Sequence, residues 1–214
     1  MVYRSAEDMS ILTVVYSGAI RYIREVMLDK FVFDIETKNT FADVGGQEHV
    51  GNLEVSFVGV YSYNQDKYLS FRENQLKELE SVMRNAGLII GFSINRFDVP
   101  VLAKYFDFDI WKIERLDLLD EIESASGMRV GLDILARTNL GTGKTSHGLE
   151  AIKFYKEGNW QALEEYCLND VKITKELYEM AKRKGYLVVP QKLTGALSRV
   201  ELQFQDLVFH PTLF

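Results

Sequence analysis

The chain has 214 residues, a formal net charge of −6 and a single cysteine, Cys167. The length fits one domain with short appendages, and the negative charge argues against a broad, non-specific grip on a polyanion such as nucleic acid. One cysteine excludes a disulfide within the chain and a cysteine-based zinc site, so we expect a protein of the reducing cytoplasm.

Residues 1–26 are predicted to be an N-terminal extension that contains an accessory helix or strand. The apolar run Ile11–Ile20 is too short to span a bilayer, and Glu7 and Asp8 before it are atypical of a secretory signal. We therefore expect no membrane contact. The main domain is predicted over residues 27–185.

Three strands are predicted at the start of the main domain. They are Lys30–Ile35, Glu54–Tyr63 and Lys67–Phe71, which are rich in Val, Phe and Tyr. The turn-like residues Asn64–Asp66 join the second and third into a hairpin. We expect these strands to be antiparallel neighbours, with the first in the centre of the sheet.

The elements that follow alternate between helix and strand. In chain order we predict a helix from Leu76 to Gly87, a parallel strand at Leu88–Phe92, a helix from Asp98, a strand at Leu116–Leu119, helical turns to about Leu135, and a polar loop at Thr138–His147. The resulting class is α/β, with a mixed five-stranded sheet and helices on both faces.

A long helix is predicted over Trp160–Lys184, because basic residues 182–184 suit the negative end of its dipole and Gly185 is a typical stop. In the tail, residues 186–214, apolar Val200, Leu202 and Phe204 alternate with polar residues. This alternation predicts an edge strand or a hairpin that packs on the domain.

Three short segments carry candidate catalytic residues. Asp34 and Glu36 are two apart in the first strand, so both point to one face of the sheet. Asp98 directly follows Phe97, where its alternative role is a helix N-cap. Tyr166 and Asp170 are four apart in the long helix and share one face. The alternatives there are an ordinary core tyrosine and a buried salt bridge.

Four carboxylates that converge on one place repel one another, and burial raises the cost. Divalent cations relieve that repulsion. Two such ions held by Asp and Glu oxygens make a site for phosphoryl transfer.

Together, these segments resemble the DEDD family of 3′–5′ exonucleases, in its tyrosine-containing subgroup, which has a ribonuclease H-like fold. The resemblance covers Lys30 to Lys184 and is strongest toward predicted exonucleases related to the proofreading domain of family B DNA polymerases. Relatives often carry Asn five residues before the middle Asp, where this chain has Ser93.

The resemblance implies a function and a set of site residues. Two Mg²⁺ or Mn²⁺ ions would be held by the four acids, Tyr166 would position the attacking water, and the substrate would be single-stranded 3′ ends, with DNA favoured over RNA. The acids are Asp34, Glu36, Asp98 and Asp170, and the expected substrate contacts are Thr37, Asn95, Phe97 and Lys144. A helicase or a polymerase is an expected partner.

Three alternatives stay open. The chain could be a catalytically silent ribonuclease H-like binding module for a helicase or polymerase, or an endonuclease of the same superfamily. The segment Gly141–Thr145 also invites a nucleotide-binding interpretation. A P-loop needs Gly five positions before its Gly-Lys pair, however, and that position is Thr138.

Overall fold

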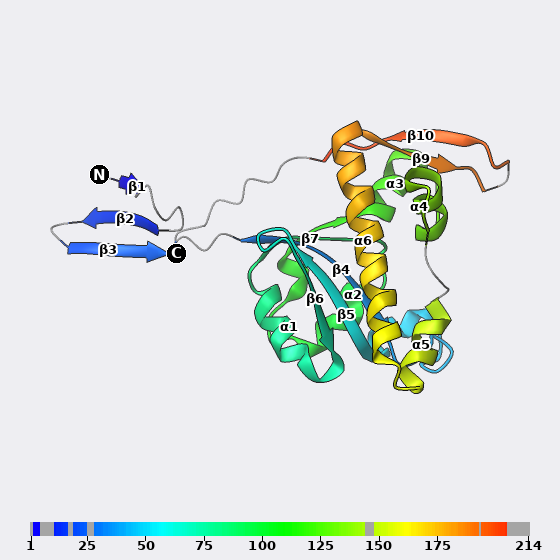
Figure 1. Ribbon diagram of the computed structural model, residues 1–214, viewed down its shortest axis with the longest axis horizontal. Helices are drawn as coiled ribbons and strands as arrows, with labels where there is room; N and C mark the ends of the chain where they lie inside the picture. Colours follow the sequence, from blue (N-terminus) through cyan, green and yellow to red (C-terminus); the bar gives the residue numbers. More distant parts are fainter. Residues whose placement is uncertain are drawn as a thin grey trace.

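A five-stranded mixed sheet forms the centre of the molecule (Figure 1). The computed structural model describes residues 2–4, 11–16, 19–24, 28–143, 148–192 and 194–204. In spatial order the strands are β6 (Lys67–Arg72), β5 (Val55–Ser62), β4 (Asp29–Thr37), β7 (Ala86–Gly91) and β8 (Glu114–Asp117). The first three are antiparallel, and β4, β7 and β8 are parallel. The predicted mixed sheet with a central β4 is confirmed.

Helices cover both faces of this sheet, as predicted (Figure 1). One face carries α1 (Leu76–Met83) and α2 (Asp98–Leu102), and the other carries α3 (Leu118–Ser126), α4 (Leu132–Leu140), α5 (Gly148–Lys156) and α6 (Trp160–Lys184). Short 3₁₀ segments lie at Gln47–Asn52, Glu73–Gln75, Ala103–Tyr105 and Ile110–Lys112. Among the residues described, no helix has both the length and the apolar character to cross a bilayer.

Strands outside the central sheet occur at both ends of the described chain. The N-terminal segment holds a three-stranded antiparallel sheet of β1 (Val2–Arg4), β2 (Ile11–Tyr16) and β3 (Ala19–Arg24). The C-terminal segment holds a hairpin of β9 (Tyr186–Pro190) and β10 (Leu197–Glu201). Its buried residues Leu187, Val189 and Val200 join the core under α3 and α4. The predicted domain boundaries remain predictions.

The segment after β7 departs from the sequence-based prediction. The predicted strand Leu116–Leu119 is wrong at its end, because β8 stops at Asp117. The Asp117 carboxylate accepts hydrogen bonds from the amides of Leu119 and Asp120, and so caps the start of α3. Gly127, with φ 70°, ends α3, and α4 is a separate helix.

The expected loop at Thr138–His147 begins later than predicted. Helix α4 continues through Leu140 and ends at Gly141, with φ 74°. A helix thus precedes the Gly-Lys pair where a P-loop needs a strand. Residues 144–147 lie outside the part of the chain described, and α5 was not predicted.

The predicted helix Trp160–Lys184 is confirmed with both ends. Asn159 accepts a hydrogen bond from the Ala162 amide at the start, and Gly185 takes the left-handed conformation at the end. Helix α6 lies very close to β5 at Gly59. A Cβ built there would lie 3.0 Å from Val171 Cγ2 and 3.1 Å from Cys167 Sγ. The missing side chain therefore lets α6 approach β4 and β5.

We predict that Gly59→Ser costs about 1–3 kcal/mol of unfolding free energy, because it overpacks this contact. Gly131→Ser is the matched control, since a Cβ there meets nothing within 4 Å and the backbone is extended, with φ −82°. It should change stability by less than about 0.5 kcal/mol. Urea unfolding of both variants measures the difference. Equal losses would contradict the close approach at Gly59.

Candidate active site

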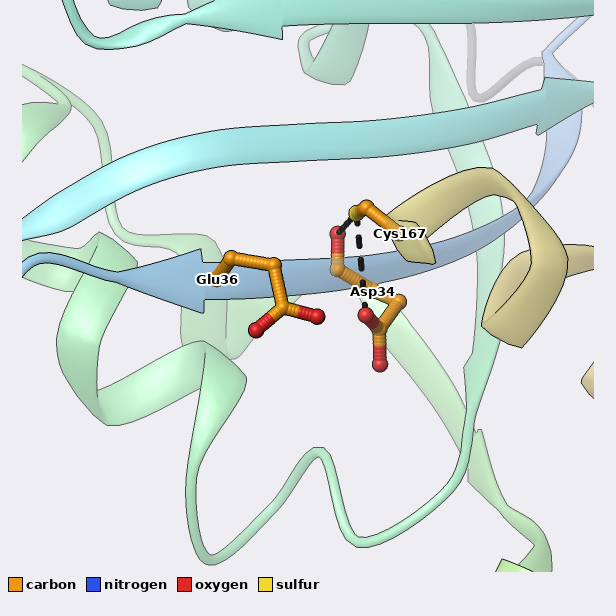
Figure 2. A group of neighbouring side chains, drawn as sticks. All are labelled: Asp34, Glu36 and Cys167. Carbon is orange, nitrogen blue, oxygen red and sulfur yellow. Dashed lines mark hydrogen bonds between the residues drawn. The ribbon is translucent and has the colours of Figure 1, made fainter. Parts of the chain in front are cut away.

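Asp34 and Glu36 leave β4 on the face that α6 covers. Phe33 and Ile35 on the same strand are buried against α1 and α2. Because side chains alternate along a strand, the two carboxylates point to the opposite face. Figure 2 shows both on one side of β4, with Cys167 reaching Asp34 from α6.

Helix α6 is held against β4 by Cys167. Its buried thiol donates to the carbonyl oxygen of Asp34 at 3.4 Å and lies 3.6 Å from the Asp34 carboxylate oxygen Oδ2. Tyr166 and Asp170 lie one turn apart on the same helix and are 3% and 2% exposed. The buried face of α6, which includes Cys167, therefore turns Tyr166 and Asp170 toward the sheet.

Asp98 reaches β4 from the start of α2. Its buried carboxylate accepts a hydrogen bond from the Ile35 amide at 3.0 Å. Strand β7 pairs with β4 only as far as Val32, so Asp98 supplies an acceptor where β7 has separated. The alternative of a helix N-cap is wrong, because Phe97 occupies that position and Asp98 is the first residue of the helix.

All five predicted catalytic residues line one cleft of about 680 Å³. From the predicted site the cleft lining includes Asp34, Glu36, Thr37, Phe97, Asp98, Tyr166 and Asp170. The elements that meet there come from positions far apart in the chain. We call this the acidic cleft.

Of the four predicted substrate contacts, Thr37 and Phe97 line the acidic cleft, whereas Asn95 and Lys144 are not among its described lining residues. The Thr37 hydroxyl donates to the Asn39 carbonyl at 2.9 Å. Asn95 does not line the acidic cleft, since its amide group donates to Asp120 at 2.8 Å and accepts from Arg115 at 3.0 Å. Lys144 lies outside the described residues.

Burial and nearby carboxylates keep the Tyr166 phenol and the Cys167 thiol protonated. Burial raises the pKa of the Tyr166 phenol, and the charges of Glu36, Asp170 and Asp34 raise it further. Burial also raises the pKa of the Cys167 thiol, followed by the effect of Asp34. Both groups are therefore neutral at neutral pH.

The residues of the cleft fit a divalent cation. One candidate ligand atom from each of Asp34, Glu36 and Cys167 lies within 4.8 Å of the others. The protonated thiol is a poor ligand, whereas carboxylate oxygens are the donors that Mg²⁺ and Mn²⁺ prefer. Asp98 and Asp170 offer two further carboxylates to the same cleft.

Sequence reasoning missed three residues of this site. The only sequence feature that could have indicated Cys167 is its position directly after Tyr166. Arg96 and Arg129 also line the acidic cleft. Arg96 lies within the segment Asn95–Asp98, but no motif marks Arg129. Both approach Glu123, at 2.7 Å and 3.8 Å.

Comparisons with known proteins agree with this architecture. A model of the RNase H superfamily matches residues 31–182, so the chain belongs to this superfamily. Its structure is similar to that of the family B DNA polymerase from the hyperthermophilic archaeon Pyrobaculum calidifontis, with a TM-score of 0.57 and 15% sequence identity.

That match covers 80% of this chain and 29% of the polymerase, and at this identity it shows the fold alone. No curated protein matches the sequence. The predicted ribonuclease H-like fold is confirmed.

The Asp98–Ile35 hydrogen bond generates a prediction about stability. Asp98→Ala leaves the Ile35 amide without this acceptor, whereas Asp98→Asn keeps an oxygen there. Both remove the charge, so the difference between them isolates the bond. We expect Asp98→Ala to be less stable than Asp98→Asn by about 1–3 kcal/mol, with faster hydrogen exchange at the Ile35 amide. Equal stability and equal exchange would show that Asp98 does not support β4.

Proposed function

We propose that this chain is a metal-dependent 3′–5′ exonuclease that releases nucleotides from single-stranded ends, with DNA favoured over RNA. One observation supports this most strongly: four carboxylates and a tyrosine from three separate segments line one cleft in a member of the RNase H superfamily. The resemblance of the same segments to the tyrosine-containing DEDD exonucleases gives the direction of cleavage.

In this proposal the carboxylates of Asp34, Glu36, Asp98 and Asp170 hold two Mg²⁺ or Mn²⁺ ions. When bound, the ions lower the pKa of water and stabilise the negative charge that develops on the scissile phosphate and the leaving oxygen. The chain supplies the fixed geometry. Asp34 and Glu36 are set by the alternation of β4, Asp98 by its bond to Ile35, and Asp170 by the packing of α6.

Tyr166 has the role of orienting the attacking water. Its phenol is protonated at neutral pH because burial and three carboxylates raise its pKa. A protonated phenol cannot accept a proton as a general base, but it can donate a hydrogen bond. The Tyr166 hydroxyl therefore holds the water in line with the phosphate.

Substrate contacts come from the walls of the acidic cleft. Phe97 is half-buried there and makes an edge-to-face contact with Phe41, at 5.8 Å between ring centroids. A face of such a ring is a stacking surface for an unpaired base. Thr37, Asn95 and Lys144 remain proposed contacts, and the side-chain amide of Asn95 would have to leave its hydrogen bonds with Asp120 and Arg115 to reach the substrate.

The decisive assay uses end-labelled single-stranded DNA and RNA with Mn²⁺. We expect a ladder of products that shortens from the 3′ end of DNA, and none from Asp34→Ala at an unchanged or higher melting temperature. A closed circular strand should resist cleavage, and cutting of the circle would indicate the endonuclease alternative. A folded parent without any nuclease activity would favour the silent binding module for a polymerase or helicase.

Metal binding is predicted to stabilise the protein, because cations bind the folded cleft and relieve repulsion among its acids. At Mn²⁺ concentrations about 100 times the dissociation constant, the gain is about 2.7 kcal/mol. Thermal melts with and without Mn²⁺ measure it. Asp34→Ala should lose most of the response, and Asp133→Asn, an acid outside the cleft, should keep it. An unresponsive parent would count against the metal site.

Removal of the Tyr166 hydroxyl tests the water-orienting role. We expect Tyr166→Phe to slow single-turnover cleavage by about 10²–10⁴-fold, the range for a positioned proton-handling group, with little change in metal affinity. Tyr178→Phe is the matched control, because Tyr178 is buried on the same helix and does not line the acidic cleft. If Tyr166→Phe stays within about threefold of the parent, Tyr166 is an ordinary core residue.

A further inference from the structure

A second cleft adjoins the acidic cleft beside the C-terminal hairpin. Its volume is about 1070 Å³, and it is lined by the end of α3, the residues that follow it, and the hairpin β9–β10. Arg129 lines both clefts. The two clefts therefore share this side chain as a common wall. We call the second one the hairpin cleft.

The hairpin cleft carries an excess of positive charge. Its charged lining residues are Arg129, Lys192 and Arg199 against one carboxylate, Glu201. This excess lies in a chain whose formal net charge is −6. The side chains of Arg129 and Arg199 are 57% and 58% exposed, so they are accessible to a ligand. A concave surface of one charge sign concentrates ligands of the opposite sign.

The wall that presents Arg199 is well ordered by its contacts. Val200 is buried in the core with residues of α3. The end of the hairpin is closed by hydrogen bonds from the Gln191 amide to the Ala196 carbonyl at 2.8 Å and from the Gln191 side chain to Ser198 at 3.0 Å. The Arg199 guanidinium lies over the Tyr186 ring at 3.8 Å. Its Nε also contacts Glu201 Oε1 at 2.7 Å. The Tyr186 ring and this exposed ion pair thus position the cation before any ligand binds, and a phosphate would have to compete with Glu201 for it.

Arg129 can exchange its present partner for an anion at low cost. Its Nε lies 3.8 Å from Glu123 Oε2, which is a loose contact, whereas Arg96 approaches the same oxygen at 2.7 Å. Exposed ion pairs of this kind contribute little to stability. A phosphate at the junction of the two clefts can therefore replace Glu123 beside Arg129.

We propose that the hairpin cleft binds the phosphate backbone of the single strand whose 3′ end enters the acidic cleft. This inference rests on the proposed exonuclease function and adds the path of the strand to it. Nucleic acid is favoured over an acidic peptide because the hairpin cleft joins a cleft whose acids and aromatic wall suit a nucleotide end. The polar side chains of Gln191, Thr194 and Ser198 add hydrogen-bonding groups along the path.

Binding is tested with full-length Asp34→Ala in metal-free buffer, by fluorescence anisotropy. The probes are a labelled thymidine tetranucleotide and a labelled thymidine oligomer of about 20 nucleotides. We expect the longer strand to bind more tightly, with affinity that falls as salt rises. Adding Arg199→Glu should remove most of the gain in affinity that the longer strand has over the tetranucleotide. It should also reduce the slope of log affinity against log salt concentration by about 0.7 for each lost phosphate contact.

Two further variants sharpen the test. Glu201→Gln should bind the long strand more tightly, because it removes the one carboxylate of the hairpin cleft. Arg72→Ala is the matched control, since Arg72 also lies over an aromatic ring, that of Trp160 at 4.7 Å, and lines neither cleft. It should leave binding unchanged. Equal binding by Arg199→Glu and the control, or equally tight binding of polyglutamate, would overturn the proposal.

Turnover separates this proposal from the proposed function. With Mn²⁺ and an otherwise unaltered chain, Arg199→Glu should hydrolyse the p-nitrophenyl ester of thymidine 5′-monophosphate at the parent rate, while its KM for the long strand rises and kcat is kept. If the parent hydrolyses neither substrate, the proposed exonuclease function is refuted. The binding assay then still tests the proposal about the hairpin cleft. If Arg199→Glu keeps the KM of the parent for the long strand, only the proposed strand binding by the hairpin cleft is refuted.

Discussion

The close packing of α6 across Gly59 is the contact on which the rest of the site depends. A helix that packs on a sheet normally stands off by the thickness of the side chains between them. At Gly59 there is no side chain, so Cys167 reaches the Asp34 backbone and carboxylate. The same approach brings Tyr166 and Asp170 into the cleft that Asp34 and Glu36 line. A helix one side chain farther away would leave the acids of β4 facing solvent.

The second constraint is the cost of gathering carboxylates in a partly buried place. Burial and mutual repulsion both disfavour the charged forms. The protein offsets part of this cost with the Ile35 amide, which donates to Asp98. It also keeps Tyr166 and Cys167 neutral, since burial raises both pKa values. In the proposed function, bound cations would relieve the repulsion that remains among these acids.

The two clefts place charges of opposite sign in sequence along one surface. Acids lie in the acidic cleft, Arg96 and Arg129 form one of its walls, and the cations of the hairpin cleft follow. A polyanion is attracted first by the arginines and then meets acids that need cations to accept it. Glu123 contacts both arginines and so partly neutralises their positive charge. In the proposed function, this division of charge lets a chain of net charge −6 bind a polyanionic strand.

The sequence by itself determined what local patterns control. The alternation of β4 put Asp34 and Glu36 on one face, and the helical period put Tyr166 and Asp170 on another, because these spacings follow from backbone geometry alone. The helix Trp160–Lys184 was predictable to the residue from its stop at Gly185. The same patterns predicted that β4, β5 and β6 are antiparallel neighbours with β4 in the centre, but they did not place β7 and β8 in the sheet.

Tertiary structure decided what depends on contacts between distant residues. The end of β8 was misplaced because the Asp117 carboxylate begins α3 there, and helix α5 was not predicted. The bond from Ile35 to Asp98, the thiol of Cys167 on Asp34, and Arg129 between two clefts join residues with no common local pattern. Only the packing of the folded chain brings such residues together, because the free energy of those contacts exists only once the layers have formed.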